Sequence, residues 1–140
     1  MKVTDISSDL SANVHKKNLM NEFHYISLID LPFVPKPLHL TSNERYMFLV
    51  MTPLEGFSLM KLWPEIGFEH SIIADLKLKI KESDSVLCHG DLGFYNVLTD
   101  GSKVTGIIDW EIARFDDSLY ELKSAFDHSP FKQDFIKILT

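Results

Sequence analysis

Three side chains that carry oxygen ligands flank a predicted hairpin in the second half of the chain. Residues 89–96 read His-Gly-Asp-Leu-Gly-Phe-Tyr-Asn, and residues 107–110 read Ile-Ile-Asp-Trp. Between these segments, an Asp-Gly pair at 100–101 separates two apolar runs, which is a strong signal for a β-hairpin. Because the open ends of an antiparallel hairpin lie together, we expect Asp91, Asn96 and Asp109 to lie within a few ångströms of one another.

Two carboxylates and an amide oxygen at one point form a set of hard oxygen ligands. Such a set suits Mg²⁺, which binds one or two carboxylates and leaves places for water and phosphate oxygens. The sequence contains no Cys–His cluster with the spacing of a zinc site. Taken singly, Asp91 could be a loop residue bonded to its own backbone, and Asn96 could be a turn residue. Together with Asp109, they predict a site for Mg²⁺ and phosphate.

The frame His-x-Asp-Leu-x-x-x-Asn around Asp91 and Asn96 resembles the catalytic loop of eukaryotic-type kinases. Gly90 stands where protein kinases have Arg, and Asp-Trp-Glu at 109–111 stands where they have Asp-Phe-Gly. Both differences resemble the aminoglycoside phosphotransferase and choline kinase superfamily, whose pattern is His-Gly-Asp-Leu, then Asn, then Ile-Asp-Trp-Glu. The resemblance is close over residues 86–125 and loose over most of the chain.

This resemblance implies a role for each matching residue. Asp91 would be the catalytic base and His89 would brace the loop, so we take both as catalytic candidates. Asn96 and Asp109 would hold Mg²⁺. The implied cofactors are ATP and Mg²⁺. The implied reaction is transfer of the γ-phosphoryl group to a hydroxyl of a small molecule, with an aminoglycoside as the first candidate.

The first half of the chain resembles a reduced N-lobe of the same superfamily. Residues 46–51 resemble its last strand and residues 52–57 its hinge, so that Met51 and Thr52 would lie beside adenine. Glu22 resembles the helix Glu that pairs with a nucleotide-binding Lys, and Lys2 is the candidate for that Lys. Without a facing Lys, Glu22 would be an ordinary exposed residue of a helix.

Hydrophobic periodicity predicts the elements that position these residues. Apolar residues at helical spacing predict a helix over about 9–28, and they include Leu10, Val14, Leu19, Met20, Phe23 and Ile26. Proline residues then end the helix. Strands at 38–40 and 46–51 form one predicted hairpin, and strands at 96–99 and 104–108 form the other. Further helices are predicted at 58–63, 69–83, 117–127 and 131–139.

These elements predict an α+β, protein-kinase-like fold in a single domain spanning residues 1–140. Its reduced antiparallel N-lobe would be 1–51, its hinge 52–57, and its mainly helical C-lobe 58–140, with the catalytic loop and hairpin. Glu111 and Arg114 would pair along a helix start in that C-lobe.

One departure from the superfamily pattern leaves alternatives open. The sequence has no Gly-x-Gly-x-x-Gly and no Gly-x-x-x-x-Gly-Lys-[Ser/Thr] motif, and it begins near the position of the family's third strand. The chain could therefore be a catalytically weak or inactive kinase-like protein that binds a nucleotide or a partner. It could also be a truncated fragment. An edge strand left exposed in the N-lobe would then be a surface for a homodimer.

Composition restricts the class of partner. The formal net charge of −6 argues against a nucleic-acid partner, because neutralising phosphates needs clustered Lys and Arg. It suits a cationic substrate, although the simpler reading is that the charge only keeps the protein soluble. The sequence contains no run of 18 apolar residues, so no membrane span is expected. A single cysteine, Cys88, excludes an internal disulfide and fits a cytoplasmic location.

Overall fold

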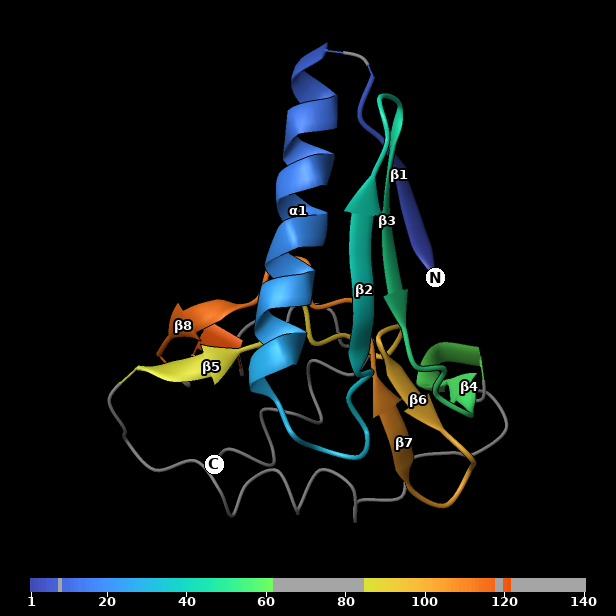
Figure 1. Cartoon of the computed structure of the whole chain (residues 1–140). Coiled ribbons are helices and arrows are strands. Elements are labelled where there is room, and N and C mark those ends of the chain that lie inside the picture. Colours follow the sequence, from blue (N-terminus) through green and yellow to red (C-terminus); the bar gives the residue numbers. More distant parts are fainter. Residues whose placement is uncertain (8, 62–84, 118–119, 122–140) are drawn as a thin grey trace.

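The structure, a computed structural model, describes residues 1–7, 9–61, 85–117 and 120–121. In Figure 1, the N-terminal helix and sheet form the upper part of the view, and the remaining short strands lie below them. In chain order these elements are β1 (Lys2–Asp5), α1 (Asp9–Leu28), β2 (Pro37–Ser42), β3 (Tyr46–Met51), β4 (Phe57–Ser58), β5 (Val86–Cys88), β6 (Val97–Thr99), β7 (Val104–Ile107) and β8 (Arg114–Asp116).

The first sheet is antiparallel and has the strand order β1-β3-β2. The predicted hairpin of β2 and β3 is present, and its turn is closed by the Asn43 side chain. That side chain accepts hydrogen bonds from the backbone N–H groups of Arg45 and Tyr46 at 2.9 and 2.7 Å. Lys2 pairs with Leu49 in the register of β1 and β3. The central strand β3 therefore holds β1, and with it Lys2, in place.

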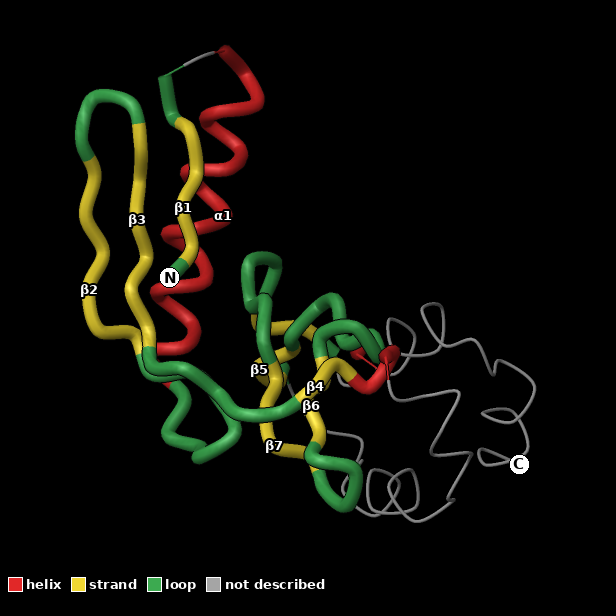
Figure 2. The backbone as a smooth tube through the Cα atoms, turned by 90° about the vertical axis from the view of Figure 1, so that its right-hand side faces the viewer, coloured by secondary structure: helices red, strands yellow, loops and turns green. Residues whose placement is uncertain are grey.

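Helix α1 packs on one face of this sheet (Figure 2). Its buried positions are Ala12, Leu19, Glu22 and Ile26, which recur at spacings of three, four and seven residues and so form one helical face. They face the buried side chains of β3, among which Leu49 is fully buried. Val14 and Met20, which belong to the predicted apolar pattern, are about half exposed instead.

The core extends from this helix and sheet to the segment that follows β7. Val34, in the connection after α1, and Trp110 and Ala113, beyond β7, belong to the same buried cluster as Leu19 and Leu49. Burial of apolar side chains contributes about 25 cal/mol for each Å² removed from water. The segment that contains Asp109 is therefore packed directly on the first sheet and its helix.

Two smaller sheets carry the rest of the described chain. The predicted hairpin at 96–108 is present as β6 and β7, with Val97 opposite Ile107, and β4 pairs with the outer side of β6. Strands β5 and β8 form a separate antiparallel pair, with Cys88 opposite Arg114. The loop 89–96 thus begins at a strand of one sheet and ends at a strand of another.

The structure corrects two predictions in this region. Ser58 lies in strand β4, residues 59–61 of the predicted helix 58–63 are helical, and residues 62 and 63 lie outside the described residues. Arg114 lies in strand β8 and binds Asp116 at 2.8 Å, so the predicted pairing with Glu111 is wrong. The predicted helices 69–83 and 131–139, and most of 117–127, lie outside the described residues. A mainly helical second half of the chain therefore stays a prediction.

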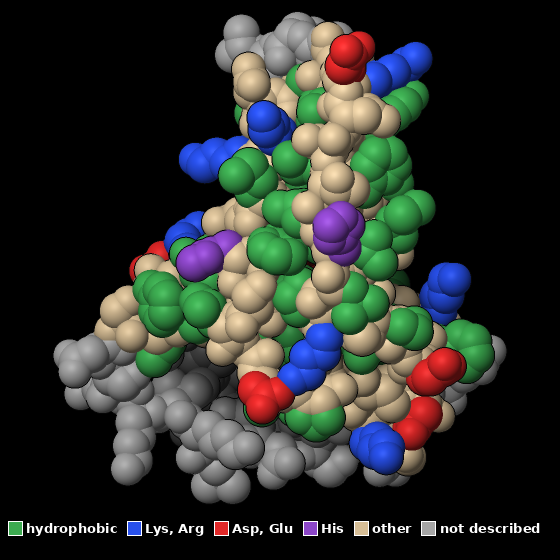
Figure 3. Space-filling view, in the orientation of Figure 1, with side chains coloured by type: hydrophobic (Ala, Val, Ile, Leu, Met, Phe, Trp, Pro, Cys, Tyr) green, Lys and Arg blue, Asp and Glu red, His purple; other side chains and the backbone are tan. Residues whose placement is uncertain are grey.

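The surface in the view of Figure 3 mixes all classes of side chain. Basic side chains lie over α1, whereas acidic side chains lie at the tip of the β2–β3 hairpin and in the lower part of the view, with hydrophobic side chains between them. Among the described residues, no helix has both the length and the hydrophobicity that crossing a bilayer requires.

Candidate active site

The loop between β5 and β6 closes on itself through Asn96. The Asn96 side-chain nitrogen donates to the backbone carbonyl of Asp91 at 2.9 Å and to the Asp91 carboxylate at 3.3 Å. Only 4% of Asn96 is exposed, so these bonds form in a protected environment. The backbone carbonyl of Asn96 accepts a hydrogen bond from the backbone N–H of Ile108 at 3.0 Å. The hairpin thus brings the residue before Asp109 into direct contact with the loop of Asp91, as its antiparallel geometry predicts.

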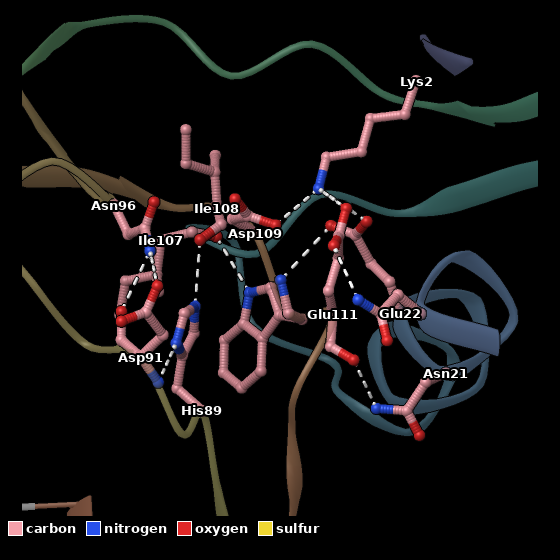
Figure 4. A network of polar contacts seen from close by, with 12 residues as sticks. Lys2, Asn21, Glu22, His89, Asp91, Asn96, Ile107, Ile108, Asp109 and Glu111 are labelled. Atoms are coloured by element: carbon pink, nitrogen blue, oxygen red, sulfur yellow. Dashed lines mark hydrogen bonds and ion pairs between the residues drawn. The ribbon is translucent and has the colours of Figure 1, made fainter. Parts of the chain in front are cut away.

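His89 ties the start of this loop to the strand end before Asp109 (Figure 4). Its Nδ1 accepts the backbone N–H of Asp91 at 3.2 Å, and its Nε2 lies 2.9 Å from the Ile108 carbonyl. A backbone N–H only donates and a carbonyl only accepts, so the neutral ring protonated at Nε2 satisfies both contacts. Burial lowers the pKa of His89. His89 is therefore placed as a brace between two segments of the site.

Lys2 reaches from β1 to three carboxylates (Figure 4). Its ammonium nitrogen lies 2.6 Å from Asp109, 2.8 Å from Glu22 and 3.1 Å from Glu111. Burial by itself lowers the pKa of Lys2, but hydrogen bonds to Asp109 and Glu22 outweigh this effect and raise it. The structure thus joins Lys2 to Glu22, the pairing that the resemblance implied, and adds Asp109 and Glu111 to it.

Glu22 is buried within the helix face that packs on the sheet. Its side chain is 1% exposed, and burial raises the pKa of its carboxyl group, which the Lys2 ammonium opposes. One of its oxygens also accepts the backbone N–H of Trp110 at 3.2 Å. A buried carboxylate is costly unless it is paired. Glu22 therefore depends on Lys2, and in return it fixes the backbone next to Asp109.

The turn after Asp109 is held by helix α1. The Asn21 side chain donates to the carbonyls of Glu111 and Ala113 at 2.7 and 3.0 Å, and Asn18 donates to the Glu111 carboxylate at 3.4 Å. Asp109 has a positive φ of 70°, a conformation that is uncommon for residues other than glycine, although Asp and Asn adopt it more often than the rest. These contacts give α1 a second role as a support for the turn.

Gly90 has a backbone conformation that suits glycine. Its φ is +87°, and a Cβ atom would lie 2.8 Å from the carbonyl oxygen of Ile112. Its N–H donates to Glu121 at 3.0 Å. The close approach of Gly90 to Ile112 packs the catalytic-loop candidate against the turn that follows Asp109.

Replacing Gly90 with alanine is expected to lower the free energy of unfolding by about 1–3 kcal/mol, from backbone strain and the contact with Ile112. Gly101→Ala is the matched control, since Gly101 has a φ of +98° but its Cβ would meet no described atom within 4 Å. Urea denaturation of both variants measures the difference. Equal losses in the two variants would show that Gly90 is not closely packed.

The hinge candidates lie where β3 leaves the first sheet. Met51 ends β3 and is packed against the core. The Thr52 N–H donates to the Lys36 carbonyl at 2.9 Å, and its hydroxyl accepts the Lys36 N–H at 2.8 Å. The backbone donor of Thr52 is thus already used within the chain. A nucleobase at this position would have to bind other groups of the segment 52–57.

The oxygen atoms of the Asn96 and Asp109 side chains are ligands of the kind that Mg²⁺ binds. In Asn96 the amide nitrogen is used by Asp91, which leaves the amide oxygen as the ligand atom. Asp109 supplies a carboxylate, and oxygen atoms of these two kinds are the ligands that Mg²⁺ prefers. Carboxylate oxygens of Glu22, Asp109 and Glu111 also lie within 4.8 Å of one another, around the Lys2 ammonium.

Comparison with known proteins agrees with this site. The sequence model of the phosphotransferase enzyme family matches residues 58–137, more than half of the chain. The chain belongs to this family. Hygromycin-B 4-O-kinase from Escherichia coli is 47% identical over 45 residues, which make up 32% of this chain and only 13% of that kinase. The resemblance to the aminoglycoside phosphotransferase superfamily is confirmed.

Membership of the phosphotransferase family implies a kinase-like fold. The α+β architecture with antiparallel sheets agrees with that class. The loop 89–96 and Asp109 lie inside the matched range, whereas Lys2, Glu22 and the hinge candidates precede it. The division of this phosphotransferase-family chain into an N-lobe, a hinge and a C-lobe stays a prediction.

Sequence reasoning did not recognise several residues that contact the site. Asn18 and Asn21 are polar residues of a long helix, and such residues give no sequence signal for a distant contact. Tyr95 stands inside the loop motif but at a position that the motif leaves open. The fully buried position of Glu22 had a signal, because it continues the spacing of Leu19 and Ile26 on one helical face.

Proposed function

We propose that this chain is a phosphotransferase that transfers the γ-phosphoryl group of ATP, with Mg²⁺, to a hydroxyl of a small molecule. The observation that carries the proposal is the junction of the Asp91 loop with the hairpin end at Asp109, through Asn96, Ile108 and His89. Family membership supports the reaction class. The catalytic and binding roles of the single residues belong to this proposal.

Asp91 acts in this proposal as the base that orients the acceptor hydroxyl and takes its proton. Catalysis of phosphoryl transfer depends mainly on positioning and on neutralising charge, and such a base contributes to both. The bonds from Asn96 fix the side chain of Asp91, and His89 fixes its backbone. Three neighbours thus restrict the base before any substrate binds, since Tyr95 also donates to it.

Lys2 and the metal candidates serve the phosphates in this proposal. The Lys2 ammonium, positioned by Glu22, binds phosphate oxygens of the nucleotide. Asn96 and Asp109 hold Mg²⁺, and neutralising the charge on the phosphate oxygens is the chemistry that bound Mg²⁺ supplies. Met51 and Thr52 border the adenine. Because Asp109 also binds Lys2, the contact between them must adjust when a nucleotide enters.

The first acceptor candidate is an aminoglycoside. The related kinase is named for hygromycin B, and the net charge of −6 suits a polycationic acceptor. Macrolides, sugars and choline-like amino alcohols are the further acceptors to screen, because the same loop motif serves them all. Fold and motif do not select among these classes, so the acceptor must be found by experiment.

Calorimetric titration with ATP, in the presence and absence of Mg²⁺, tests the proposal. We expect Mg²⁺-dependent binding with a Kd between the micromolar and low millimolar range. Transfer of labelled γ-phosphate to hygromycin B, and then to the other acceptors, follows as the assay of turnover. Tight Mg-ATP binding without transfer to any acceptor would support a second candidate, an inactive kinase-like binding protein. No binding at millimolar ATP would contradict both.

A further inference from the structure

The Tyr95 side chain binds one carboxylate oxygen of Asp91, the proposed base. The Tyr95 hydroxyl donates a hydrogen bond to Asp91 Oδ1 at 2.8 Å, while Asn96 donates to Oδ2 at 3.3 Å. A hydroxyl at hydrogen-bond distance from the base is the arrangement that a general base needs with its acceptor. The phenol is thus placed on Asp91 as an acceptor hydroxyl would be.

Gly93 leaves room for the Tyr95 ring in this position, because it has no side chain. A Cβ atom on Gly93 would lie only 2.6 and 2.7 Å from two carbons of the ring, closer than real Cβ atoms approach. The ring therefore lies directly against the Gly93 backbone and leads the hydroxyl back to Asp91, four residues earlier. A side chain on residue 93 would force the ring away from this place.

The backbone of the loop is anchored on the side of β4. The Ser58 hydroxyl lies 3.3 Å from the carbonyl oxygens of both Phe94 and Tyr95, and the Met60 N–H donates to the Phe94 carbonyl at 3.2 Å. These contacts hold the main chain on either side of Tyr95, and the residue as a whole is 38% exposed. A partly exposed side chain on an anchored main chain is what the displacement proposed below requires.

The phenol is a proton donor at neutral pH. A tyrosine hydroxyl is ordinarily protonated at neutral pH, so it can donate its hydrogen to the Asp91 carboxylate. Hydrogen bonds between a neutral donor and a carboxylate are among the stronger ones in proteins. Any molecule that takes the place of Tyr95 must therefore replace this bond with one of its own.

We propose that Tyr95 is a gate for the acceptor: its phenol occupies the acceptor position on Asp91, and a productive acceptor must displace it. This inference rests on the proposed role of Asp91 as base. The gate keeps water from the base while ATP is bound, which limits wasteful hydrolysis. It also selects acceptors, since only a molecule that brings its own hydroxyl to Asp91 compensates for the lost bond.

Hydrolysis of Mg-ATP in the absence of an acceptor tests the gate. Tyr95→Phe keeps the ring but removes the donor, so water can reach Asp91, and we expect the rate of hydrolysis to rise roughly tenfold. The control Tyr46→Phe makes the same chemical change at the start of β3, in the first sheet, and should leave the rate unchanged. Adding Asp91→Asn to Tyr95→Phe should remove the increase. An unchanged or lower rate in Tyr95→Phe would overturn the gate.

Carbon-13 NMR of the tyrosine ζ-carbons tests the contact without any turnover. The Tyr95 resonance is assigned by its loss in Tyr95→Phe, and it should shift in Asp91→Asn because its hydrogen-bond partner changes. It should shift again when Mg-ATP and an acceptor are added together. A resonance that does not respond to Asp91→Asn would disprove the contact even if phosphoryl transfer occurs. A responsive resonance in a chain without ATPase activity would support the contact but refute the catalytic role that we propose.

Discussion

Replacing Asp91 with asparagine is expected to lower the turnover number of phosphoryl transfer by roughly 10²- to 10⁴-fold, the usual contribution of a positioned base. Asparagine has nearly the same size but cannot take the proton of the acceptor hydroxyl. Tyr95 and Asn96 both donate to the Asp91 carboxylate, whereas an amide accepts through only one oxygen. One of these two bonds must therefore be lost, and a small decrease in stability accompanies the loss of activity.

The affinity of Asp91→Asn for Mg-ATP distinguishes a specific loss of turnover from a general loss of folding or nucleotide binding. Asp91 is proposed to act on the acceptor and not on the nucleotide, so Mg-ATP should bind to Asp91→Asn within about twofold of the parent. The matched control is Asp100→Asn, in the exposed turn between β6 and β7, where the same substitution should leave turnover unchanged. Equal turnover numbers for Asp91→Asn and the parent would remove Asp91 from its proposed role.

Replacing Asp109 with asparagine is expected to abolish the increase in ATP affinity that Mg²⁺ produces. The substitution removes the carboxylate of the proposed Mg²⁺ site. Asp109 has a φ of 70°, and asparagine is among the few residues that tolerate this conformation, so the backbone should keep its course. The change therefore tests the charge of the side chain with little disturbance of the turn.

Two calorimetric titrations of Asp109→Asn, one with Mg²⁺ and one with a chelator, measure this effect. We expect the two affinities to become equal, and the metal-free affinity to stay the same or improve, because Lys2 loses a competing partner at 2.6 Å. Asp116→Asn, at the end of β8, provides a carboxylate control whose partner is Arg114. A parent-like response of Asp109→Asn to Mg²⁺ would show that Asp109 does not hold the metal.

Local patterns predict the elements that this structure describes most fully. The 3.6-residue spacing from Leu19 to Ile26 predicts α1, and the apolar run 46–51 predicts β3. The Asp-Gly pair at 100–101 predicts the hairpin that brings the loop 89–96 to Asp109. Each of these signals lies within a short stretch of sequence, where the physics of periodicity and turn chemistry acts directly.

Contacts between segments that are distant in the sequence leave much weaker patterns in the sequence itself. Strand β8 has three residues, Arg114–Asp116, with charges at both ends, and it exists because it pairs with β5. Asn21 meets Glu111 and Ala113 only because α1 packs across the turn, which no periodicity encodes. The conformation of Asp109 is likewise enforced by its neighbours. Tertiary packing decides such features, so they become visible only in three dimensions.

The contact between His89 and Trp110 makes the fluorescence of Trp110 sensitive to changes in the site. Their ring centroids lie 4.6 Å apart, and Trp110 is 8% exposed. A shielded indole emits at shorter wavelength than one in water, and a protonated imidazole beside it quenches the emission. The chain has one other tryptophan, Trp63, which can be changed to phenylalanine. The fluorescence of Trp110 would then follow the loop and its neighbouring turn as ligands bind, without any attached dye.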